Sequence, residues 1–130
     1  MDTDVVSFLI SGKGEHARFG ELIRGHLLVV SFATVAELLV GAAIAGWGER
    51  KISQLEDSLK AYVVVPGTEA VARAWARLSA RFRDQVSEND LWIAASSLAQ
   101  VDPPPIVTNN LRHFRPIADE FALELVHPDL

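Results

Sequence analysis

An isolated carboxylate in an apolar run is the first feature of this sequence that could do chemistry. The stretch SFATVAELLVGAAIAG, residues 31–46, contains one charged residue, Glu37. Burying an ionised carboxylate without a partner is costly, so such a group usually pairs with a cation, binds a metal or takes up a proton. We therefore expect a partner for Glu37 elsewhere in the chain.

Other oxygen-bearing side chains occupy comparable positions. Asp2 and Asp4 are expected at the end of a first strand, Asp90 in the first turn of an apolar helix, and Asn110 just after a strand. Ligands of open α/β sheets bind beyond the carboxyl ends of the strands. Oxygen ligands without cysteine suit Mg²⁺ or Mn²⁺ better than zinc. This pattern predicts a metal site that activates water for attack on a phosphoryl group.

Structural interpretations of the same residues stay open at this stage. Thr34-x-x-Glu37 and Ser87-x-x-Asp90 each match a helix capping box, in which an acid stabilises the first turn. Each acid taken alone is better explained by capping than by catalysis. Asn110 is equally explained as a turn residue.

The elements that must position these residues alternate along the chain. Short runs rich in Val, Leu and Ile predict buried strands; they lie at 27–31, 61–66, 104–108 and 123–127. Helical patterns with cap signals separate them; they lie at 15–25, 34–46, 48–62, 68–84 and 87–100. Such alternation predicts right-handed βαβ units and a parallel sheet covered by helices on both faces.

Bulk composition limits the classes of protein that fit. The chain has 130 residues, no cysteine and a formal net charge of −5, which predicts one domain over 1–130 and suits a cytoplasmic protein. Glu37 near the middle of the most apolar stretch disfavours a membrane span. The net negative charge by itself argues against a general nucleic-acid binder, which usually has a basic face.

Four motifs, in order, carry a resemblance to a known family. They are DTDVVSFL (2–9), TVAELLVG (34–41), SENDLWIAASSLA (87–99) and PIVTNNLRHF (105–114). Together they resemble the PIN-domain ribonucleases, and most of all the VapC-type toxins of bacterial toxin–antitoxin pairs. The resemblance covers essentially the whole chain. It implies a PIN-like three-layer α/β/α sandwich with a central parallel sheet.

The resemblance also assigns roles residue by residue. It places the first three acids of the family on Asp2, Glu37 and Asp90 and the fourth position on Asn110, while Asp4 stands where the family more often has Asn. It implies Mg²⁺-dependent endonucleolytic cleavage of RNA by metal-activated water. Asp2 and Asp90 would bind the metal directly. Glu37 would bind the metal or its water, and Asn110 would orient the ligands.

Partners follow from the same resemblance. It implies a homodimer and a cognate antitoxin protein that blocks the site. Arg112 and His113, just past Asn110, are candidate contacts to the RNA substrate, with a surface or capping role as the alternative. The apolar stretch at 38–47 is a candidate surface for the second subunit or the antitoxin, with core packing as the alternative.

Two other functions remain to be distinguished from a ribonuclease. One is a PIN-fold module that binds RNA or a partner without cleaving, weakened by the neutral Asn110. The other is a phosphatase of the haloacid-dehalogenase type, because DTDVV (2–6) matches the nucleophile motif of those enzymes. That motif normally follows a long hydrophobic strand and needs a downstream acidic pair, and neither is clear here.

Overall fold

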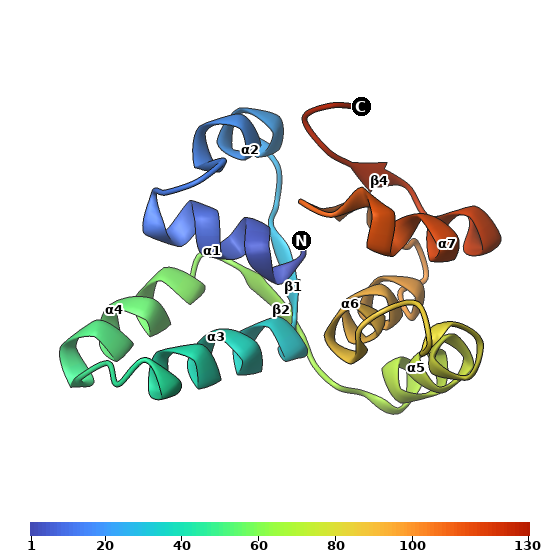
Figure 1. Cartoon of the computed structure of the whole chain (residues 1–130), viewed down its shortest axis with the longest axis horizontal. Coiled ribbons are helices and arrows are strands. Elements are labelled where there is room, and N and C mark those ends of the chain that lie inside the picture. The colour runs from blue at the N-terminus through green and yellow to red at the C-terminus, as the bar shows by residue number, and fades with distance from the viewer.

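Helices and short parallel strands alternate along the chain in the computed structural model, which describes residues 1–130 (Figure 1). The strands are β1 (Val29–Ser31), β2 (Val63–Val65), β3 (Ile106–Val107) and β4 (Leu125–Val126). The helices are α1 (Thr3–Ser11), α2 (His16–Ile23), α3 (Phe32–Ile44), α4 (Glu49–Leu59), α5 (Glu69–Phe82), α6 (Glu88–Leu98) and α7 (Leu111–Phe121). The α/β class and the four expected strands are confirmed, each strand being shorter than its apolar run.

The strands form two parallel pairs. In one pair Val29 of β1 lies opposite Val63 of β2, and in the other Ile106 of β3 lies opposite Leu125 of β4. The N-terminus lies between the pairs (Figure 1). The Met1 amino group donates a hydrogen bond to the Val29 carbonyl at 3.0 Å. The next backbone N–H, that of Asp2, donates to the carbonyl of Val107 in β3 at 2.9 Å.

Two helices differ from the sequence-based expectation. A first strand ending at Asp2 and Asp4 is not formed, because Asp2 caps α1 and its side chain accepts a hydrogen bond from the N–H of Val5. Helix α7 was not expected from the sequence. Its apolar face has helical spacing, but Pro116 in its middle removes one backbone donor and argues against a helix when the sequence is considered alone.

One of the two predicted capping boxes, Thr34-x-x-Glu37, is not formed. Helix α3 begins earlier than expected, at Phe32, and Ser31 is its N-cap. Thr34 therefore lies inside the helix, fully buried, with its hydroxyl 3.1 Å from that of Thr3. Ser87 is the N-cap of α6 as expected, and its hydroxyl accepts a hydrogen bond from the N–H of Asp90 at 3.2 Å.

The hydrophobic core consists of two clusters. The larger joins α5, α6 and α7, and includes Val71, Leu78 and Phe82 of α5. The smaller joins α1, β1, α3 and α4, and includes Leu55 and Leu59. No helix is long and apolar enough to cross a membrane.

Candidate active site

Asp2 is the most firmly held of the candidate residues. Its carboxylate is buried and accepts three hydrogen bonds. One oxygen accepts from the N–H of Val5 and the other from the N–H of Asn109, both at 3.0 Å, and the hydroxyl of Thr108 donates to the second oxygen as well. The loop after β3 and the first turn of α1 therefore fix this carboxylate in one orientation.

Glu37 has a polar partner that the sequence did not indicate. Its side chain lies on the exposed face of α3, so the expectation of a buried carboxylate is wrong. The side-chain amide of Asn89, in α6, donates to Glu37 and also to the hydroxyl of Thr3 at 3.2 Å. Because Thr3 in turn contacts Thr34, this network links α1, α3 and α6 beside the site.

Asp90 is paired with a histidine from α7. Its carboxylate lies 3.0 Å from Nδ1 of His113, and the Asp90 side chain is 17 % exposed. His113 was singled out as a candidate RNA contact, and here it orients a carboxylate. Arg112, the other candidate RNA contact, is exposed at the start of α7.

Electrostatics show that the acids share one neighbourhood. Partial burial raises the pKa of the Asp4 carboxyl, and the negative charges of Asp2, Glu37 and Asp90 raise it further, while His113 acts in the opposite direction. We call Asp2, Asp4, Glu37 and Asp90 the acidic cluster. Its members make no ion pair with lysine or arginine. The cluster therefore carries unbalanced negative charge.

The loop that follows β3 supports the cluster through residues other than the expected one. Asn110 stands at the N-cap position of α7 without a side-chain capping bond. Its N–H donates to the Thr108 hydroxyl at 2.8 Å, and Thr108 and Asn109 make the contacts to Asp2. The run Thr-Asn-Asn after a strand was the available signal, but it could not say which of the three residues contacts the first acid.

Comparisons with known proteins place this arrangement in a family. Residues 1–119 match the family model of the PIN domain. The chain belongs to the PIN domain family. The match also disfavours the phosphatase interpretation, as does the helix that begins where that motif would need a strand end.

Relatives with curated names match this chain over most of their length. Ribonuclease VapC2 of Haemophilus influenzae is 31% identical over 119 residues, which cover 88% of this chain and 87% of the relative. Ribonuclease VapC1 of the same species is 27% identical over 124 residues, covering 92% of this chain and 91% of the relative.

Solved structures agree on the fold. DNA-bound VapBC from Salmonella typhimurium has a TM-score of 0.77 and 25% identity, covering 98% of this chain and 95% of the other. VapBC-1 from nontypeable Haemophilus influenzae has a TM-score of 0.75 and 25% identity, covering 99% and 96% of the two chains.

The carboxylates of this PIN domain are of the kind that a hard divalent cation binds, but their side chains do not converge on one point. No three of its His, Asp or Glu side chains stand close enough together to hold a metal ion. Glu37 and Asp90 are instead turned toward Asn89 and His113. Carboxylates without a lysine or arginine partner are nevertheless the ligands that Mg²⁺ and Mn²⁺ prefer.

Proposed function

We propose that the protein is a metal-dependent endoribonuclease and the toxin of a toxin–antitoxin pair, with Mg²⁺ or Mn²⁺ as its cofactor. The observation that carries the proposal is the acidic cluster, whose charge raises the pKa of Asp4 and is balanced by no lysine or arginine. Membership of the PIN family and relatives named ribonucleases support RNA as the substrate. Such a substrate would place the activity in the cytoplasm.

Each residue of the cluster has a distinct part in this proposal. Asp2 and Asp90 would hold the cation, Asp2 in a fixed orientation and Asp90 after release from His113. The bound cation would offset the phosphate charge and lower the pKa of a water molecule. Glu37 is exposed, so it can accept a proton from an attacking water. Asn110 would orient these groups from the loop after β3.

The start of α7 is the proposed contact to the RNA phosphates. Arg112 is exposed, and His113 projects from the same turn toward Asp90. A guanidinium can neutralise a phosphate charge. Arg112 precedes His113 in the same helical turn, and these two groups would let a chain with a net charge of −5 hold RNA locally.

Cleavage of RNA with Mg²⁺ and with excess chelator tests the nuclease proposal. We expect Asp90→Asn to lower the cleavage rate at least about a hundredfold, since it removes a charged ligand at the proposed metal site. Asp84→Asn makes the same change of charge on an exposed residue outside the site and should cleave like the parent chain. Equal rates for the two variants, or full activity in chelator, would contradict the proposal.

The alternative function, a PIN-fold module that binds RNA without cleaving, predicts another result. In that case the parent chain would retain RNA under native conditions and leave it intact with Mg²⁺ or Mn²⁺. The neutral Asn110 is the residue that favours this alternative, because it supplies no charge to a second cation.

We infer two protein partners, a second copy of this chain and an antitoxin. The C-terminal part of α3 supports the inference, because Val40 and Ile44 are 55% and 83% exposed. Trp47 follows them and is also partly exposed. Solved relatives in VapBC complexes support the antitoxin. Ile44→Glu should weaken self-association measured by sedimentation. Glu56→Gln, at an exposed position of α4, should leave self-association unchanged.

A further inference from the structure

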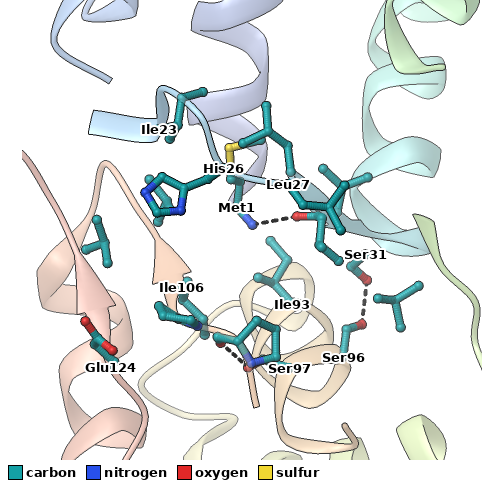
Figure 2. Close-up of a pocket in the computed structure, with 18 of the residues that line it drawn as sticks. Met1, Ile23, His26, Leu27, Ser31, Ile93, Ser96, Ser97, Ile106 and Glu124 are labelled. Atoms are coloured by element: carbon teal, nitrogen blue, oxygen red, sulfur yellow. Dashed lines mark hydrogen bonds between the residues drawn. The ribbon is translucent and has the colours of Figure 1, made fainter. Parts of the chain in front are cut away.

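Two hollows of the molecule differ in the chemistry of their linings. One lies between the strand pairs, and its lining is mostly apolar and contains no lysine or arginine. Figure 2 shows Ile23, Leu27, Ile93 and Ile106 around it. The other, which we call the α7 hollow, is lined by five residues of α7, three of them charged; they are Leu111, Arg112, Arg115, Pro116 and Asp119. Of the two, the α7 hollow has the lining that suits a charged ligand.

The α7 hollow occupies the side of the helix that faces away from the core. Its lining residues recur at intervals of three and four along α7, so they share one side of the helix. Phe114, Ile117 and Ala118 lie on the other side and are buried in the larger core cluster. Packing of α7 against the core therefore does not use the guanidinium groups of Arg112 and Arg115.

Neither arginine of the α7 hollow has a carboxylate partner. Arg112 and Arg115 are exposed and form no ion pair. Asp119 lines the same hollow without an ion pair, and the next acid, Glu120, is paired with Arg81 of α5 at 3.3 Å. Two guanidinium groups therefore stand against one carboxylate, which leaves the α7 hollow with a net positive charge.

The order of charges along α7 is the reverse of the order that stabilises a helix. The helix dipole favours acids in the first turn and bases in the last. Helices α1, α4, α5 and α6 each have an acid in the first turn. Helix α7 has Arg112 there and no acid, and Asp119 and Glu120 are in its last turn. Helix stability therefore does not account for the arginines of α7.

The α7 hollow lies next to the acidic cluster around the helix. His113 faces the cluster, with Nδ1 3.0 Å from the Asp90 carboxylate. Successive residues of a helix are about 100° apart, so Arg112 lies about 100° around α7 from His113, and Arg115 lies about 60° farther in the same sense. The three side chains therefore lead from the acidic cluster to the α7 hollow.

We propose that the α7 hollow binds a phosphate of the RNA backbone, with Arg115 as a binding residue in addition to Arg112. The proposal rests on the proposed cleavage of RNA at the acidic cluster, and it extends the bound strand beyond the phosphate nearest that cluster. A planar guanidinium donates two parallel hydrogen bonds to the oxygens of one phosphate. A carboxylate would fit it as well, but an RNA strand that reaches the acidic cluster carries a further phosphate at each nucleotide.

Two properties follow for the α7 hollow. Contacts to phosphate carry no sequence information, so the contribution of Arg115 to binding should be the same for RNAs of different sequence. Asp119 is a negative charge in the same hollow, so it opposes the phosphate and limits the affinity.

Binding of a labelled single-stranded RNA, followed by fluorescence anisotropy in excess chelator, tests the proposal without cleavage. We expect Arg115→Gln to lower the affinity at least about fivefold in about 50 mM salt, because one phosphate contact is lost. Between about 50 and about 200 mM salt, the slope of log affinity against log salt should become shallower by about 0.7. Oligouridine and oligoadenosine should lose affinity by the same factor.

Two further variants separate the α7 hollow from general charge effects. Arg50→Gln makes the same change of charge at an exposed, unpaired residue of α4, which lies at the opposite end of the molecule from α7 (Figure 1). This variant should bind RNA with the affinity and salt slope of the parent chain. Asp119→Asn should tighten binding about twofold or more, because it removes the opposing charge. The thermal midpoint of Arg115→Gln should match that of the parent chain, since the side chain is exposed.

A parent-like salt slope for Arg115→Gln, or equal losses for Arg115→Gln and Arg50→Gln, would overturn the proposal. A loss confined to one of the two RNA sequences would also overturn it. Unchanged RNA binding by Arg115→Gln, together with weaker binding of an oligoglutamate probe, would assign the hollow to an acidic protein segment and overturn it too. If the parent chain binds RNA but leaves it intact with Mg²⁺, the nuclease proposal fails, while a shallower slope for Arg115→Gln still supports the α7 hollow.

Discussion

Both halves of the molecule combine helices with two short strands (Figure 1). Their buried apolar clusters differ greatly in size. The C-terminal half, from α5 to β4, has a cluster of 14 buried apolar residues, whereas the cluster of the N-terminal half, from α1 to β2, has 5. The exposed apolar side chains of α3, Val40 and Ile44, lie in the half with the smaller core. The comparison teaches that the C-terminal half holds most of the buried apolar core, whereas the N-terminal half leaves apolar side chains of α3 exposed.

The candidate active site lies where these halves meet. Asp2 and Glu37 come from the N-terminal half, and Asp90 and His113 from the C-terminal half. Hydrogen bonds join the two halves here, among them the bond of Asn89 to Glu37 and that of Ser96 to Ser31 at 2.7 Å. The geometry of the acidic cluster therefore depends on the junction as well as on either core.

The largest expected effect tests the difference between the cores. Leu78→Ala removes a side chain that is 1% exposed in the larger cluster and should lower the free energy of unfolding by about 4 kcal/mol. Leu59→Ala, in the smaller cluster and less completely buried, should cost about 2 kcal/mol. Urea unfolding measures both. Equal costs would contradict the view that the halves differ in packing.

The next effect concerns the junction. Asn89→Ala removes the amide that holds Glu37 and Thr3, so cleavage of RNA should fall about 10- to 100-fold, as is typical when support for a ligand is lost. The urea midpoint should change little because Asn89 is partly exposed. Gln85→Ala, at an exposed position with no side-chain bond, is the control. A parent-like rate for Asn89→Ala would show that the junction does not position the site.

A smaller effect is a change of stability with pH that arises from the Met1 amino group. Its pKa falls from 8.0 to about 6 on folding, so between these values the unfolded chain binds more protons and stability rises with pH. From pH 6 to pH 8 the gain should be about 2 kcal/mol, since one pKa unit corresponds to about 1.4 kcal/mol. Thermal unfolding in chelator measures it, and N-terminal acetylation should remove this part of the slope. Matching slopes for the two forms would be inconsistent with a buried amino group.

The smallest effects concern helix capping. In the C-terminal half Thr68 caps α5 through the N–H of Val71, and Thr68→Ala should cost about 1 kcal/mol. In the N-terminal half α4 begins at Gly48 without a side-chain cap, and Gly48→Ser should add a few tenths of a kcal/mol. Differential scanning calorimetry resolves the two directions. A gain from Thr68→Ala would contradict the capping role.

Local sequence signals were sufficient for most elements. The burial expected for the strands is wrong for β2, where Val63 and Val64 are 47% and 42% exposed. The apolar runs and helical patterns nevertheless predicted strands β1 to β4 and helices α2 to α6, and the structure confirms these elements. These signals succeeded because periodicity depends on each element's own geometry. Helix α7 was missed, because Pro116 is a local signal against a helix that tertiary packing of Phe114 and Ile117 overrides.

The candidate site was only partly accessible from the sequence. The positions of Asp2, Glu37 and Asp90 at the starts of helices indicated a shared edge, and their effect on Asp4 is consistent with one neighbourhood. Nothing in the spacing could show that Asn89 holds Glu37 or that Thr108 and Asn109 hold Asp2. Those contacts join residues far apart in the chain.

The sequence by itself determined the class of the fold, the order of its four strands and of helices α2 to α6, and the kind of side chain that could bind a metal. It did so because hydrophobic period, caps and chemical type are properties of short segments. Only the tertiary structure decided that Glu37 is exposed, that His113 lies on Asp90, and that the Met1 amino group bonds to the Val29 carbonyl of β1. These outcomes depend on how separate segments pack together.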